Sequence, residues 1–161
     1  MIQRKQTIYL LLAFICDLLL LFFPIFILSA KSFGQLQEGT FGAFGIESEG
    51  YAQAYPIYVL FIIMALFTAV GIALFRNRKK QLMICRLNLI IHALVSLGLL
   101  TFYYVGKSIA LDRLKEKGFS DPQFGVGVGF FLCIAAIPFI ILAIRGIRGD
   151  EQLLRSIDRI R

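Results

Sequence analysis

One carboxylic acid, Asp17, lies in the middle of the first long apolar segment of the chain. A charge at the centre of a bilayer costs at least about 2.5–3.5 kcal/mol, so such a group needs a partner or a cavity. The third apolar segment offers Asn88, His92 and Ser96, which share one helix face, and Arg86, whose long side chain could reach toward either end. We therefore predict a polar contact within the membrane among these five residues.

Three roles for that contact remain open: a structural lock between helices, handling of protons or ions, or contact with a lipid or a partner. A carboxylate beside an imidazole could also do acid–base chemistry. No third residue completes a recognisable catalytic constellation with Asp17 and His92, so we predict no catalytic residue.

The apolar content is far above that of a soluble domain: 58% of the 161 residues are hydrophobic, against roughly 45–50% on average. Four apolar runs, at about 7–29, 54–75, 82–106 and 125–144, reach the roughly 20 residues that a helix needs to cross a bilayer. Lipid offers no hydrogen-bond partners, so each run should be helical. The expected fold class is an all-α integral membrane protein, an up-down bundle of four transmembrane helices over 1–148 with a tail over 149–161. The first run exceeds the roughly 7–15-residue core of a signal peptide, and we interpret it as a retained span.

Basic residues concentrate on one side of the predicted membrane. Arg4 and Lys5, the loop "RNRKK" and the arginine-rich tail all fall on that side. The positive-inside rule therefore places both termini in the cytoplasm. On the other side we expect an irregular segment over 30–53 and a short amphipathic helix over 107–118.

The tail, "RGIRGDEQLLRSIDRIR", combines charge with an apolar stripe at helical spacing. Such a helix can lie on anionic lipid headgroups or dock into a groove of a partner protein. A solvated helix that only supplies positive charge on the cytoplasmic side is the third interpretation. The candidate docking residues are Leu153, Leu154, Arg155, Ile157, Arg159 and Ile160.

The three cysteines, Cys16, Cys85 and Cys133, occur singly in or beside apolar runs, and none belongs to a C-x-x-C pair. Metal sites and redox pairs need several such ligands close together, so we predict no metal and no cofactor. The basic residues lie close to the membrane and lack an aromatic platform, which argues against nucleic acid as a partner.

Three stretches carry a family resemblance: the opening "MIQRKQTIYLLLAFI", the central "RNRKKQLMICRLN" and the closing "AIRGIRGDEQLLRSIDRIR". Together they resemble the DUF4293 family of Bacteroidota membrane proteins over the length of the chain. The resemblance implies a four-helix, multi-pass protein of the bacterial cytoplasmic (inner) membrane. It implies no activity and no site residue.

Short loops, no catalytic constellation and a patterned tail favour a non-enzymatic subunit or accessory factor of a larger membrane complex. The expected partners are anionic lipid headgroups and another membrane protein. A small proton-coupled transporter or channel that uses Asp17 is the alternative. An enzyme is less favoured, because His92 and Tyr103 lie about 16 Å apart along one helix.

Overall fold

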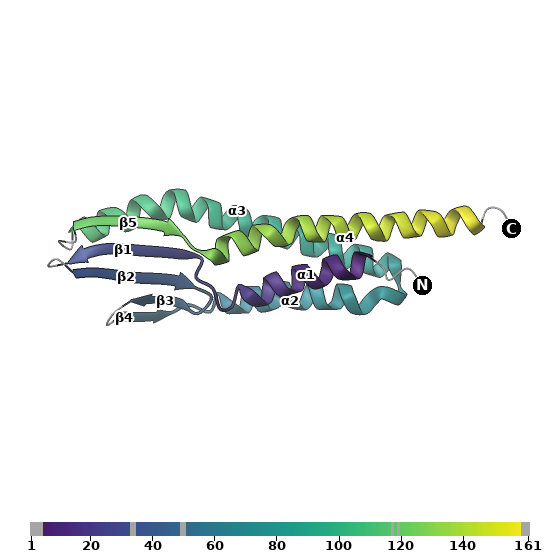
Figure 1. Cartoon of the computed structure of the whole chain (residues 1–161), viewed down its shortest axis with the longest axis horizontal. Coiled ribbons are helices and arrows are strands. Elements are labelled where there is room, and N and C mark those ends of the chain that lie inside the picture. Colours follow the sequence, from purple (N-terminus) through teal and green to yellow (C-terminus); the bar gives the residue numbers. More distant parts are fainter. Residues whose placement is uncertain (1–4, 33–34, 49–50, 117, 119, 159–161) are drawn as a thin grey trace.

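The computed structural model describes residues 5–32, 35–48, 51–116, 118 and 120–158. The molecule is elongated, with a helix bundle at one end and a β-sheet at the other (Figure 1). The helices are α1 (Lys5–Leu19), α2 (Tyr58–Ala73), the short 3₁₀ helix η1 (Leu74–Arg76), α3 (Arg78–Glu116) and α4 (Val128–Asp158).

The four α-helices form an up-down bundle in which α1 packs against α2 and α4, and α3 packs against the same two helices. The α1 helix begins, and α4 ends, at the end of the molecule opposite the sheet (Figure 1). We call this the terminal end and the opposite one the sheet end. With η1 included, α2 is long and apolar enough to cross a membrane, as are α3 and α4, whereas α1 is apolar but shorter.

A five-stranded antiparallel sheet occupies the sheet end, in the order β4-β3-β2-β1-β5. Strand β1 lies between β2 and β5, and its Phe26 pairs with Phe41 of β2 on one side and with Val126 of β5 on the other. The structure is mostly helical, but the prediction of an all-α protein is wrong. The strands are β1 (Phe26–Ser32), β2 (Gln35–Gly42), β3 (Gly45–Ser48), β4 (Tyr51–Ala54) and β5 (Ser120–Val126).

The first predicted span, 7–29, is divided between a helix and a strand. Helix α1 ends at Leu19, and β1 begins at Phe26. Pro24 lies between them; proline supplies no backbone N–H and disfavours helical geometry at Phe23. Beyond it, "IFILS" is a short apolar run, and such a run fits a buried strand as well as a helix. Strand pairing with β2 and β5 decides between the two.

The two segments predicted outside the membrane also differ from expectation. The region over 30–53, expected to be irregular, supplies the end of β1 and the strands β2, β3 and β4. The short amphipathic helix expected over 107–118 is not separate, because α3 continues without a break to Glu116. At 39 residues, α3 is about 58 Å long, nearly twice the roughly 30 Å of a bilayer core. It therefore joins the bundle to the sheet as one rigid element.

Aromatic packing joins bundle and sheet around Phe26, which is 1% exposed. Its ring lies 5.3 Å from that of Phe124 on β5, 5.4 Å from that of Phe102 on α3 and 6.0 Å from that of Phe130 on α4. Aromatic rings bury large areas and prefer such tilted contacts. Phe26 thus fixes the orientation of α3, α4 and β5 at the junction.

The start of α4 approaches the α1–β1 connection closely. The Gly127 amide donates to the Ile25 carbonyl at 2.8 Å, and the Gly129 amide donates to the Pro24 carbonyl at 2.8 Å. A Cβ at Gly127 would overlap the Pro24 carbonyl, and one at Gly129 would lie 2.8 Å from the Phe23 carbonyl oxygen. The two glycines are therefore required by contact with a neighbouring backbone.

Candidate functional site in the helix bundle

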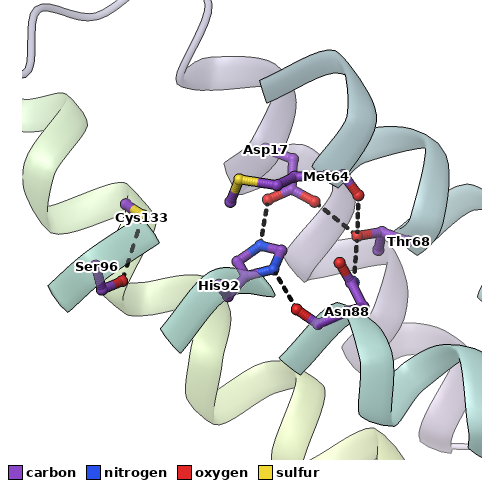
Figure 2. Close-up of polar contacts among 7 residues, drawn as sticks. All are labelled: Asp17, Met64, Thr68, Asn88, His92, Ser96 and Cys133. Carbon is purple, nitrogen blue, oxygen red and sulfur yellow. Dashed lines mark hydrogen bonds and ion pairs between the residues drawn. The ribbon is translucent and has the colours of Figure 1, made fainter. Parts of the chain in front are cut away.

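Asp17 and His92 form an ion-pair contact in the interior of the bundle. Asp17 Oδ1 lies 2.8 Å from His92 Nε2, and both side chains are 0% exposed. Asp17 comes from α1 and His92 from α3, two helices that are diagonal to each other in the bundle. Figure 2 shows the imidazole held between the carboxylate and the carbonyl of Asn88, which lies on the preceding turn of α3. The sequence left His92 and Arg86 open as partners of Asp17, and the structure places His92 there.

The second oxygen of the carboxylate is held by α2. The Thr68 hydroxyl lies 2.7 Å from Asp17 Oδ2 and 3.0 Å from the Met64 carbonyl, and its single proton can be donated to one of them at a time. Asn88 Nδ2 donates to Thr68 Oγ1 at 2.8 Å. Thr68 and Asn88 are 0% and 1% exposed. We call Asp17, Thr68, Asn88 and His92 the buried polar network; it joins α1, α2 and α3.

The hydrogen bonds determine how many protons the carboxylate–imidazole pair carries. His92 Nδ1 lies 2.9 Å from the Asn88 carbonyl oxygen, which can only accept, so Nδ1 carries a hydrogen. The contact between Nε2 and Asp17 needs one more hydrogen, which resides on the ring as an imidazolium or on the acid. In both cases the pair has no net charge, which reduces the cost of burying it.

Thr68 was not among the predicted residues. The available signal was a hydroxyl within the apolar run of the second span, where Ser and Thr side chains often bond across helices. Because Thr68 lies on α2, the network joins three helices.

Two of the predicted polar residues lie outside the network. Ser96 shares the α3 face of His92 but contacts Cys133 on α4, with Oγ and Sγ 3.4 Å apart (Figure 2). Arg86 does not contact Asp17: it is exposed and lines a groove between α3 and α4. Arg86 lies two residues before Asn88, about 200° around the helix, so it cannot share the buried face. Of the two partners that the sequence left open for Asp17, the structure therefore shows His92 and not Arg86.

Two glutamines outside the predicted set are buried toward the terminal end. Gln81 on α3 is 1% exposed, and its Nε2 donates to the Gly71 carbonyl at 2.9 Å. Gln6 on α1 is 2% exposed and packs beside Gly146 of α4, where a Cβ would lie 3.2 Å from the Gln6 Cβ. Both amide atoms of Gln6 have no hydrogen-bond partner among the described residues. A second polar layer thus lies nearer the terminal end than Asp17.

The predicted docking residues of the tail lie at the end of α4, which continues as one helix to Asp158. For four of them, the structure describes the backbone only, and Arg159 and Ile160 lie outside the described residues. The four on the helix are Leu153, Leu154, Arg155 and Ile157.

Cys16, Cys85 and Cys133 are all buried and unpaired. Across the described ranges, no group of three or more His, Cys, Asp or Glu side chains is arranged to hold a metal ion.

The fold and the site define a class: a helical protein with membrane-length apolar helices, a sheet at one end and a neutral carboxylate–imidazole pair inside the bundle. The chain belongs to the DUF4293 family, a domain of unknown function, whose family model matches residues 2–160. No curated protein matches the chain.

Proposed function

We propose that the protein is a non-enzymatic subunit or accessory factor of a larger complex in the bacterial inner membrane. The observation that carries the proposal is the state of the buried polar network. Asp17 and His92 are 0% exposed. Their polar atoms form hydrogen bonds with each other, with Thr68 on α2 and with the Asn88 carbonyl on α3. A group arranged in this way locks helices together, and it lines none of four grooves on the described part of the chain.

The orientation belongs to the same proposal. The terminal end faces the cytoplasm, because the positive-inside rule assigns the basic N-terminus, the "RNRKK" loop and the tail to that side. The sheet and the last turns of α3 then extend beyond the opposite surface. The tail over 149–161 is the cytoplasmic contact, either with anionic headgroups or with the groove of a partner protein.

The test is purification of the tagged native protein in mild detergent, followed by mass spectrometry of the proteins that accompany it. A partner should copurify with the wild-type chain and be lost when residues 149–161 are deleted. As a matched control, replacing Arg155 and Arg159 by Gln removes charge but keeps the apolar stripe; it separates headgroup attraction from docking in a groove. A chain that migrates only as a free monomer, with no copurifying protein that depends on the tail, would refute the proposal.

A proton-coupled transporter is the second candidate, and the observation in its favour is the 2.8 Å contact between Asp17 Oδ1 and His92 Nε2, which one hydrogen bridges. This hydrogen could be transferred as a proton to water if Asp17 or His92 became accessible to water. Vesicles that contain the protein should then show proton-coupled uptake that Asp17→Asn abolishes. Uptake that survives Asp17→Asn would remove Asp17 from the mechanism, and the absence of any substrate-dependent uptake would exclude this class.

A further inference from the structure

A groove of about 180 Å³ lies between α3 and α4 near the terminal end, and two arginines line it. Arg86 comes from α3 and Arg148 from α4, and both are exposed. Neither guanidinium forms an ion pair with a described residue. The carboxylate of Glu151 lines the same groove and reduces its net positive charge without cancelling it.

The two arginines enter the groove from antiparallel helices. Helix α3 runs toward the sheet end and α4 runs away from it (Figure 1), and the groove is lined by Leu82 and Arg86 of α3 and by Arg148 and Gln152 of α4. Two cationic side chains that line one small groove repel each other, and an anion bound between them removes that repulsion. Guanidinium groups bind phosphate through paired N–H donors, and so this arrangement suits a phosphate group.

A third arginine on the same face of α3 supports this assignment. Arg78 precedes Leu82 by four residues and Arg86 by eight, so the three residues form one stripe along the helix. The Nη1 atom of Arg78 is buried and has no hydrogen-bond partner among the described residues. Buried donors are usually satisfied, so this donor, on the turn of α3 that precedes Leu82, has capacity for an additional acceptor.

The surface beside the groove is apolar and points toward the sheet end. Met83, Leu87, Ile90 and Leu94 follow one another along α3, and they are 61%, 41%, 55% and 63% exposed. Met83 and Leu87 directly follow the groove-lining residues Leu82 and Arg86, and Ile90 and Leu94 lie about one and two turns beyond Arg86 toward the sheet end. A ligand that fits both regions has an anionic head and one or more long hydrocarbon chains.

We propose that this groove binds the phosphate headgroup of an anionic lipid, with Arg86 and Arg148 as direct ligands and the acyl chains along Leu87, Ile90 and Leu94. This site is distinct from the tail over 149–161. It rests on the proposed membrane location, because the lipid must come from the surrounding bilayer. A free phosphate compound would use the same arginines but would not need the apolar surface.

The experiment is native mass spectrometry of the purified protein in detergent with phosphatidylglycerol, and with zwitterionic phosphatidylcholine as the comparison. The wild-type chain should bind phosphatidylglycerol at least tenfold more tightly than phosphatidylcholine. The double variant Arg86→Gln, Arg148→Gln should lose at least tenfold in affinity for phosphatidylglycerol. The matched control is Arg145→Gln, because Arg145 is exposed on α4 but does not line the groove; this variant should stay within twofold of the wild type.

All these side chains are exposed, and circular dichroism and the melting temperature of each variant establish that the fold is retained. Unchanged phosphatidylglycerol binding by the folded double variant, or an equal loss in Arg145→Gln, would overturn the proposal. Complete displacement of the lipid by millimolar inorganic phosphate or glycerol phosphate would also overturn it, since a free anion would then be the ligand. Lipid binding is measured on the purified protein in detergent, whereas membership of a complex is tested by copurification. A negative result in one experiment therefore leaves the result of the other unchanged.

Discussion

Replacing His92 by Leu should destabilise the bundle more than replacing Asp17 by Asn, although both changes remove the ion pair. The Leu variant leaves Asp17 Oδ1 with no donor in a site that is 0% exposed, because only the Thr68 hydroxyl remains, on Oδ2. In the Asn variant the new amide nitrogen can donate to His92 Nε2, while its oxygen accepts from Thr68. The two variants therefore differ in whether a buried carboxyl oxygen keeps its partner.

The contacts predict the order in which the variants lose free energy of unfolding. Breaking a buried pair from one side costs about 3–5 kcal/mol, so His92→Leu should lose about 3 kcal/mol. Asp17→Leu should lose about 1–2 kcal/mol, because the Thr68 hydroxyl can turn to the Met64 carbonyl at 3.0 Å and only His92 Nε2 is left unpaired. Asp17→Asn should lose about 1 kcal/mol or less. Replacing both Asp17 and His92 by Leu should cost less than the sum of the two single changes, because no polar group is then left without its partner.

The assay is reversible unfolding of the purified protein in mixed micelles with increasing SDS, followed by circular dichroism. Ser96→Ala is the control on the same face of α3; its hydroxyl has only the 3.4 Å contact with Cys133 Sγ, and the change should stay within about 0.5 kcal/mol of the wild type. If His92→Leu proved as stable as Asp17→Asn, the network would not be a lock between helices. Losses that add fully in the double variant would refute the direct coupling of Asp17 and His92.

Three further changes test the junction between bundle and sheet by thermal unfolding in detergent. Gly127→Ala should lose about 1–3 kcal/mol because its Cβ would overlap the Pro24 carbonyl, whereas Gly98→Ala, with no atom within 4 Å of the added Cβ, should be neutral or slightly stabilising; equal melting temperatures would contradict this contact. Phe26→Ala should cost about 3–5 kcal/mol by leaving a cavity among the aromatic rings, and a loss below about 1 kcal/mol would show that the junction is loosely packed. Gly45→Ala should destabilise the β3–β4 hairpin, because Gly45 has φ +126° and its Cβ would overlap the Gln53 carbonyl; unchanged protease sensitivity of the hairpin would contradict that expectation.

The site was only partly predictable from the sequence. The intrinsic cost of burying Asp17, together with the spacing of Asn88 and His92, was enough to indicate a contact between the first and third helices. Helical geometry alone would also have excluded Arg86, since 100° per residue places it far from the buried face. Thr68 could not be singled out in this way, because which face of α2 meets Asp17 depends on how three helices pack.

The sequence by itself determined that four apolar helices form a bundle, because a helix satisfies its own backbone hydrogen bonds and an apolar helix must cover its surface with other apolar groups. The tertiary structure decided the sheet, because β1 acquires its partners from β2 and from β5, a strand that begins nearly ninety residues after β1 ends. A strand satisfies its backbone hydrogen bonds only through such distant partners, whereas a helix satisfies its own. For that reason the segment after Pro24 was indistinguishable in the sequence from the end of a membrane helix, and only pairing with β2 and β5 made it a strand.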